Sequence, residues 1–277
     1  MKFHFSRKQL CIPYAVFLVC FVLIPMFIIV FYAFTAPVME NGVQVGITFS
    51  FDNLVDLFTN PTKLLNMGRS ILIGLLTTVI CLLIAYPVAY ILARSGIRRN
   101  AVLLLLFIVP MWVNFVLRVN ALKELLSWIG ILGASDFWNY FNTVLGMVYD
   151  FLPFMILPLY TTLLKIDNSY VEAAKDLGAS APVAFWKVTL PLSYPGIVSG
   201  ITMVFLPSMT NYVVSTLLGN GKVGIIGSLI EQSFLNSQWN AGSMMALLLL
   251  VVMFVSTWLT GGFQNEDAAS SRGGNLW

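Results

Sequence analysis

Charged residues are scarce in this chain of 277 residues. Lys, Arg, Asp and Glu together make up 10% of it, whereas about a quarter of the residues of a soluble domain are charged. Hydrophobic residues make up 58% of the chain, and the mean hydropathy is +0.86. So little charge cannot cover a surface that faces water, and the composition is that of an integral membrane protein.

Histidine and cysteine are scarce as well. His4 is the single histidine, and Cys11, Cys20 and Cys81 fall in apolar segments at no regular spacing. Because metal sites and disulfide frameworks are built from clustered or paired residues of these types, we expect neither. The sequence also lacks a Gly-rich phosphate loop, a nucleophilic serine motif and paired carboxylates at one membrane depth. The absence of these motifs argues against an enzyme, including one embedded in the membrane.

Long apolar runs are what the sequence has instead, each near the roughly 20 residues that cross a bilayer as a helix. We expect one all-α transmembrane domain with six spans, at residues 10–34, 71–92, 101–119, 143–163, 190–211 and 241–263. Proline, glycine and polar residues interrupt the third and fifth runs, so these helices are predicted to lie inside a bundle. The first run is too long for a signal peptide and is interpreted as a retained helix. The polar tail, residues 264–277, is expected to be disordered.

Basic residues are distributed unevenly over the segments between these spans. Ten of the 15 Lys and Arg residues lie before the first span, after the second, after the fourth or after the sixth. The other side holds Lys63, Arg69, Arg118, Lys123 and Lys222. Since cytoplasmic loops carry the excess of basic residues, both termini are predicted to be cytoplasmic. The net charge of +3 reflects this bias and does not indicate a nucleic-acid site.

The segment between the fourth and fifth spans, residues 169–188, is polar and rich in alanine. Ser169 and Glu172 have the spacing of a capping box, which predicts a helix start at Ser169. Gly178 is placed to end that helix in a left-handed conformation, and Pro182 suits the first turn of a second helix. We call this predicted cytoplasmic helix-glycine-helix segment the knuckle. Its short amphipathic helices suit either a groove in a partner protein or the bilayer surface.

One motif favours docking in a partner protein over binding to the bilayer surface. Glu172-Ala173-Ala174, then Gly178, then Leu190-Pro191 resembles the EAA motif of ABC importer permeases, with Val188 where the family usually has isoleucine. The resemblance implies a type I importer fold in which the knuckle docks in an ATP-hydrolysing subunit and transmits its motion. Glu172, Ala173, Ala174, Gly178, Leu190 and Pro191 are then the coupling residues. A role for Glu172 in capping its own helix alone is the alternative.

A longer resemblance covers residues 71–263. The segments 103–126, 146–180 and 206–230 are similar to the B-type permease of bacterial spermidine/putrescine importers. This similarity implies an inner-membrane subunit that forms half of a polyamine path. It implies as partners a second permease, an extracytoplasmic polyamine-binding protein that meets residues 36–69 and 212–240, and an ATPase dimer. The ATPase would bind ATP and Mg²⁺, and this chain itself would carry no cofactor.

The solute is the less specific inference, because relatives of this fold carry iron, thiamine, sulfate or phosphonates. A secondary transporter is a further alternative, although the sequence shows no internal repeat. A polycation needs acidic and aromatic groups along its path, and the candidates are Trp112, Tyr149, Asp150 and Tyr160. For the aromatic residues, ordinary packing is the alternative. For Asp150, which we place in the outer half of the fourth span, the alternative is an ion pair with Arg118.

Overall fold

The structure is a computed structural model that describes residues 7–40, 43–94 and 100–259. The chain divides into two compact units. Of the described residues, the larger unit contains those within 66–228 and 253–259, and the smaller contains those within 7–65 and 229–252. The tail at residues 264–277, expected to be disordered, lies outside the described residues.

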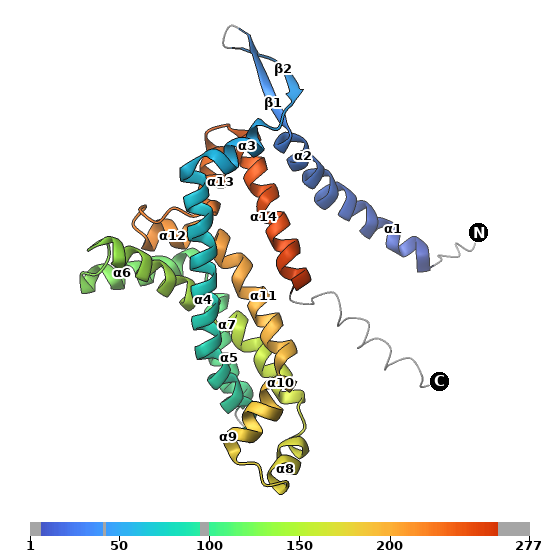
Figure 1. The fold of residues 1–277 in the computed structure, drawn as a ribbon, viewed down its shortest axis with the longest axis vertical. Coiled ribbons are helices and arrows are strands. Elements are labelled where there is room, and N and C mark those ends of the chain that lie inside the picture. Colours follow the sequence, from blue (N-terminus) through green and yellow to red (C-terminus); the bar gives the residue numbers. More distant parts are fainter. Residues whose placement is uncertain (1–6, 41–42, 95–99, 260–277) are drawn as a thin grey trace. The chain divides into compact units, whose positions relative to one another are not determined.

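Three long helices carry the larger unit (Figure 1): α4 (Pro61–Arg94, whose first turn belongs to the smaller unit), α7 (Asp136–Lys165) and α11 (Tyr194–Thr210). Their buried faces form one apolar core. Small residues let the helices approach closely. A Cβ atom added to Gly196 of α11 would lie 2.8 Å from Cβ of Thr162 and 3.0 Å from the Pro158 carbonyl oxygen of α7. The thiol of Cys81 in α4 donates to the carbonyl oxygen of Val148 in α7, at 3.8 Å.

The expected third span is broken. It consists of α5 (Asn100–Ile108), the 3₁₀ turn η2 (Val109–Trp112) and α6 (Phe115–Ile129), and α6 turns away from the preceding helix by 93°. Asn114 causes the restart, because its side-chain oxygen accepts hydrogen bonds from the backbone N–H groups of Val116 and Leu117 at 3.0 and 3.3 Å. The third span, expected at residues 101–119 with polar residues and a proline interrupting it, is bent in the structure. Arg118 lies after the bend and not within a straight span.

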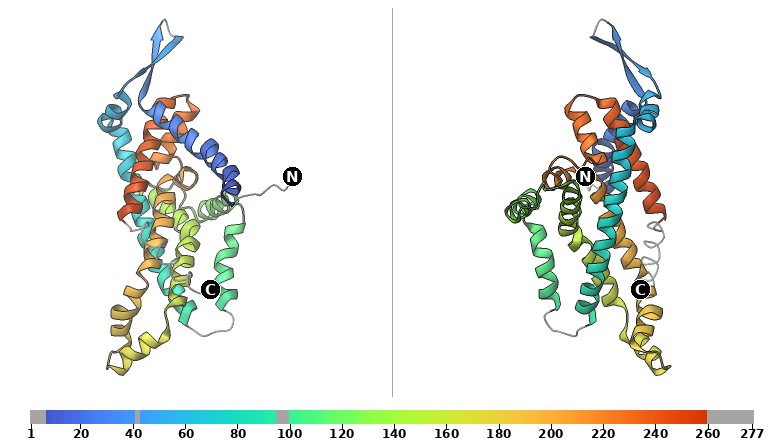
Figure 2. Two further views of the ribbon diagram at one scale, coloured as in Figure 1. Left: turned by 90° about the vertical axis from the view of Figure 1, so that its right-hand side faces the viewer. Right: turned by 60° about the vertical axis from the view of Figure 1, so that its left-hand side comes forward.

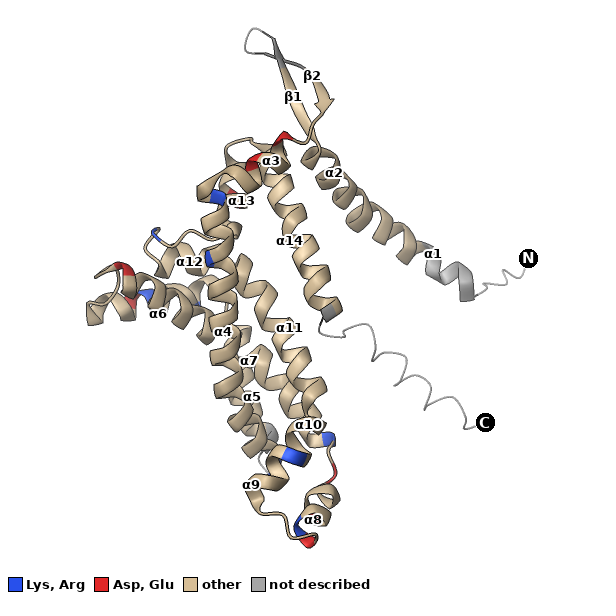
Figure 3. Ribbon diagram, in the orientation of Figure 1, with Lys and Arg blue, Asp and Glu red and all other residues tan. Residues whose placement is uncertain are grey.

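The remaining elements of the larger unit are short. They are α8 (Asn168–Asp176), α9 (Ala181–Ala184), the π-helical turn η3 (Phe185–Thr189), α10 (Leu190–Leu192), α12 (Tyr212–Leu218) and the start of α13 (Ile226–Leu235). Figure 2 shows α8 and α9 together at one end of this unit, beyond the ends of α4 and α7. Charged residues of the unit lie around α6 and around α8 to α10, while the long helices between them are largely uncharged (Figure 3). This distribution fits helices that cross a membrane.

The smaller unit contains α1 (Arg7–Leu18), the π-helical turn η1 (Val19–Leu23), α2 (Ile24–Ala33), a hairpin of β1 (Thr35–Glu40) and β2 (Val43–Phe49), α3 (Asp52–Thr59) and most of α14 (Trp239–Leu259). The strands are antiparallel, and Thr35 pairs with Phe49. Asn240 of α14 holds the base of the hairpin, because its amide donates to the carbonyl oxygens of Tyr32 and Thr35 at 3.0 and 2.6 Å. Asn53 donates to the Thr35 carbonyl as well, at 2.9 Å.

Four described helices are long and apolar enough to cross a membrane, at residues 13–33, 61–94, 136–165 and 239–258. Two bent pairs, 102–112 with 115–129 and 181–192 with 194–210, bring the number to six if each pair is one span. The all-α membrane fold predicted from the sequence is thereby confirmed. The predicted orientation of the termini remains a prediction.

Candidate functional site

The N-cap residue of the first helix of the knuckle lies two residues earlier than the sequence predicts. Asp167 is the N-cap residue of α8, and its Oδ1 atom accepts a hydrogen bond from the Ser169 backbone N–H at 3.0 Å. This bond holds the pKa of the exposed Asp167 carboxyl below its ordinary value. The capping box at Ser169 and Glu172 is therefore wrong, because a neighbouring acid already caps the helix. Glu172 lies in the second turn of α8, too far along to cap it, and its side chain is left for another contact.

The second predicted feature of the knuckle, a left-handed Gly178, is confirmed. Its φ angle is +86°, a conformation that glycine adopts without the clash of a Cβ atom. The N–H groups of Gly178 and Ala179 donate to the carbonyls of Lys175 and Ala174 at 2.8 and 3.0 Å and so close the last turn of α8. The chain turns sharply here and restarts as α9, with Pro182 in its first turn as predicted.

A shallow hollow of about 360 Å³ opens between the two arms of the knuckle. Its lining is mostly small or apolar: Ala174, Leu177, Gly178, Ala179, Val183, Ala184, Lys187 and Val188. Leu177 is 90% exposed, although it is a large apolar side chain. The hollow and the exposed leucine together give the knuckle an apolar face of the kind that short amphipathic helices present to a groove in a partner protein. We call this surface the knuckle groove.

The predicted coupling residues do not all meet in the knuckle groove. Ala174 and Gly178 line it, and Ala173 is exposed on α8 beside it. Leu190 and Pro191 lie in α10, where Leu190 is half-buried against the core and Pro191 is exposed. Glu172 faces a different pocket.

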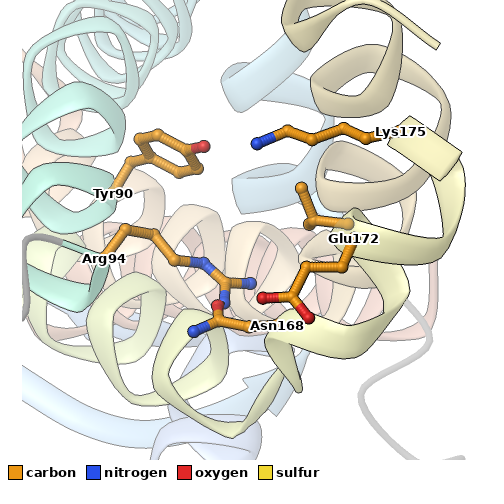
Figure 4. A pocket seen from close by; sticks show the side chains of 6 residues that line it. Tyr90, Arg94, Asn168, Glu172 and Lys175 are labelled. Atoms are coloured by element: carbon orange, nitrogen blue, oxygen red, sulfur yellow. The ribbon is translucent and has the colours of Figure 1, made fainter. Parts of the chain in front are cut away.

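That second pocket, of about 200 Å³, is lined by Tyr90, Arg94, Asn168, Val171, Glu172 and Lys175 (Figure 4). Tyr90 and Arg94 come from the last turn of α4, and the other four come from α8. The guanidinium group of Arg94 donates to the side-chain oxygen of Asn168. This contact was not predicted from the sequence. The signal that was available is the spacing of four residues between Tyr86, Tyr90 and Arg94, which places them on one face of a helix.

The candidate substrate-path residues lie in two places. Arg118 Nη2 is 2.6 Å from Asp150 Oδ1, and its guanidinium carbon is 5.9 Å from the ring centre of Tyr149. Asp150 lies near the middle of the 30-residue α7, because this helix begins at Asp136, before the fourth span expected at residues 143–163. Tyr160 lies ten residues further along α7, about 15 Å away at 1.5 Å per residue, and is buried in the core. Trp112 is 81% exposed in η2.

The ion pair between Arg118 and Asp150 was one of the two alternatives for that acid, and the structure contains it. It removes the cost of an isolated charge within a membrane helix.

Among the described residues, no group of three or more His, Cys, Asp or Glu side chains is placed to hold a metal ion.

The apolar spans together with the capped knuckle define a multi-pass membrane protein. Residues 85–265 match the family described as "Binding-protein-dependent transport system inner membrane component". The chain belongs to this family and is a multi-pass protein of the bacterial inner membrane. Its role in such a system is transport and not catalysis.

Similar proteins carry more specific names. The chain is 37% identical over 249 residues to the spermidine/putrescine transport system permease protein PotB of Haemophilus influenzae, with 85% of this chain and 86% of that protein covered. It is 34% identical over 249 residues to PotB of Escherichia coli, with 85% and 90% covered.

Two solved structures share the fold at low sequence identity. One is a bacterial ABC transporter involved in the import of the acidic polysaccharide alginate, with a TM-score of 0.67 at 16% identity, covering 93% of this chain and 96% of that one. The other is a bacterial alginate ABC transporter in complex with an alginate pentasaccharide-bound periplasmic protein, with a TM-score of 0.72 at 13% identity and 93% of each chain covered.

Proposed function

We propose that this chain is a permease subunit of an ATP-driven importer of polyamines such as spermidine and putrescine, and that it forms half of the translocation path. The observation that carries the proposal is the identity of 37% and 34% to two PotB permeases over most of both chains. The neighbours of known structure, whose solute is an acidic polysaccharide, support the importer fold and not the solute.

The knuckle groove is the proposed docking site for the ATPase. A partner side chain can enter it because Ala174 and Gly178 leave the backbone accessible, and Leu177 supplies apolar area at its edge. Ala173, Leu190 and Pro191 complete this coupling region, and Glu172 lines the neighbouring pocket beside α4. In this proposal the ATPase dimer binds ATP and Mg²⁺, a second permease supplies the other half of the path, and an extracytoplasmic polyamine-binding protein delivers the substrate.

Four residues remain the proposed contacts of the substrate path. Trp112 presents an exposed aromatic ring, and the half-exposed ring of Tyr149 already lies beside the Arg118 cation; aromatic faces attract ammonium groups in the same way. Asp150 and Tyr160 are buried in the described structure, so they would meet the substrate in another conformation of the transport cycle. In the described conformation the Asp150 carboxylate is paired with the Arg118 guanidinium, which stands where a substrate ammonium group would bind.

The proposal is tested by reconstituting the chain with its genomic partners in liposomes and measuring uptake of labelled spermidine and putrescine. We expect ATP-dependent uptake that unlabelled polyamines inhibit, and that iron, thiamine, sulfate and phosphonates at equal concentration do not. Uptake of one of these other solutes in place of polyamines would make the chain a permease of a related importer. ATP-independent uptake that follows an ion gradient would instead indicate a secondary transporter.

A further inference from the structure

The C-terminal end of α4 contacts the knuckle and the residues just before and after it at three places. Tyr86, Tyr90 and Arg94 follow one another at intervals of four residues, and each meets a residue from the segment that begins at Asn168. Arg94 donates to the Asn168 side chain, which lies in the first turn of α8. Figure 4 shows the arginine and Tyr90 reaching from α4 toward α8.

The second contact is aromatic, because the Phe185 ring packs against the rings of both Tyr86 and Tyr90. The Phe185 ring centre lies 5.7 Å from that of Tyr86 and 5.6 Å from that of Tyr90, with interplanar angles of 90° and 89°. Such edge-to-face contacts are the arrangement that aromatic rings prefer. Phe185 opens the π-helical turn η3, and single π-helical turns occur often at functional positions.

The third contact is a buried hydrogen bond. The Tyr86 hydroxyl lies 2.9 Å from Ser193 Oγ. Because Ser193 gives its own hydroxyl hydrogen to the Leu190 carbonyl at 2.8 Å, Tyr86 is the donor in this pair. Both residues are buried, and a buried hydroxyl is costly without a partner. Apolar side chains would fill the space as well, so the polar pair fixes a particular alignment of α4 against α10.

We propose that Tyr86, Tyr90 and Arg94 form a strut that joins the knuckle and the C-terminal end of α4 into one rigid body. The knuckle is continuous in sequence with α7 and α11, whereas Arg94 and Asn168 are 74 residues apart. The strut therefore carries a movement of the knuckle to a span that the chain itself does not connect to it. This inference rests on the proposed function, because the ATPase supplies the movement.

Three separated attachments explain why the joint is rigid. Eight residues separate Tyr86 from Arg94, which places the outer contacts about 12 Å apart along α4 at 1.5 Å per residue. A single contact would let the knuckle pivot about one point. Attachments at three levels fix both the position and the direction of α4, so the two elements move together as packed rigid elements do.

The first test of the strut measures the distance between α4 and α8. Spin labels are placed at Ile91 of α4 and Tyr170 of α8, which are 62% and 58% exposed and lie outside the knuckle groove. In the complex with the ATPase, we expect one narrow distance distribution that ATP does not shift. Phe185→Ala should broaden this distribution, whereas Phe185→Tyr, which keeps the ring, should preserve it. Trp128→Ala, at an exposed ring of α6 away from the strut, is the control and should leave it narrow.

Transport provides the second measurement. Phe185→Ala should keep ATP hydrolysis but reduce the polyamine imported per ATP by about fivefold or more, the lower end of typical coupling effects, and Phe185→Tyr should restore it. If Phe185→Ala does not assemble, the double variant Tyr86→Phe, Arg94→Gln keeps the packing, removes the outer two attachments and carries the same expectation.

Two results would overturn the strut. One is an ATP-dependent shift of the Ile91 to Tyr170 distance in the unmodified protein, and the other is normal import per ATP in the variants. Failure of the proposed function is a separate outcome. If the unmodified complex imports no polyamine, the distance measurement still decides whether the knuckle and α4 move together.

Discussion

Arg118 and Asp150 form an ion pair of 2.6 Å, and each side chain is less than a tenth exposed. The pair joins α6, the helix after the bend, to the middle of α7. The Nε and Nη1 atoms of Arg118 are also buried, and among the described residues they have no hydrogen-bond partner. The arginine therefore depends on Asp150 for its charge balance, and the acid depends on the arginine.

This dependence predicts that either single substitution destabilises the chain. Asp150→Asn leaves a buried guanidinium uncompensated, and breaking a buried pair in this way costs about 3–5 kcal/mol. Thermal unfolding of the purified chain in detergent measures the loss. Adding Arg118→Gln to Asp150→Asn should recover part of it, because no unpaired charge remains. A single variant as stable as the unmodified chain would show that the pair contributes nothing.

The turn of the knuckle makes a second prediction. Gly178→Val places a β-branched side chain at a φ angle of +86°, and a left-handed conformation costs an ordinary L-residue about 1–2 kcal/mol. We expect the variant chain to reach the membrane but to lose copurification with the ATPase. Gly178→Asn is the control, since asparagine tolerates this conformation better than other residues. Equal copurification of both variants would mean that the turn geometry is not required.

The close approach of α7 and α11 leads to a third prediction. Gly196→Ala pushes a methyl group against the Thr162 side chain and the Pro158 carbonyl, and such overpacking costs about 1–3 kcal/mol. Gly68 of α4 has no atom within 4 Å of the equivalent position. Gly68→Ala should therefore leave thermal stability unchanged or raise it, because alanine favours a helix. Equal unfolding temperatures for Gly196→Ala and Gly68→Ala would contradict this prediction.

Orientation in the membrane is open to direct measurement. Reporter proteins fused after Gly96 and after Ser180 should be active in the cytoplasm, because the basic residues favour that side. A fusion after Gly133 should report the opposite side. A reporter after Ser180 that reads as extracytoplasmic would place the knuckle groove out of reach of any ATPase.

The cap of α8 predicts a dependence on pH. Hydrogen bonding lowers the pKa of Asp167 below its ordinary value of 3.8. The group therefore stabilises α8 fully above that ordinary value and loses its effect as the pH falls through the lowered one. Amide hydrogen exchange of α8 should accelerate over this acidic range. Asp167→Asn keeps a capping oxygen that does not titrate, so the part of the acceleration that belongs to Asp167 should disappear.

Hydrophobicity and short-range patterns predict most of the helices and the knuckle. The apolar runs mark where the long helices lie, and Gly178 is recognisable because few other residues suit a left-handed helix end. The site of the first cap was predicted wrongly since Asp167 and Ser169 are both good caps. Local sequence does not say which of them begins the helix. The break at Asn114 has a similar cause, because a polar residue inside an apolar run is compatible with a span or a restart.

Contacts between distant residues were the least predictable. The pairing of Arg94 with Asn168, and of Tyr86 with Ser193, depends on how helices far apart in the sequence pack together. The hairpin at residues 35–49 was not predicted either. Its strands are short, and Asn53 and Asn240 hold its base from outside the hairpin.

The knuckle groove has a consequence for how such systems diversify. Ala174, Gly178, Ala179 and Ala184 present mainly backbone and single methyl groups to whatever enters. A partner that fits there recognises a shape, and the charges on the neighbouring surface can change without altering that shape. If the ATPase docks in this groove as proposed, its attachment and the substrate preference of the membrane helices can evolve independently of one another.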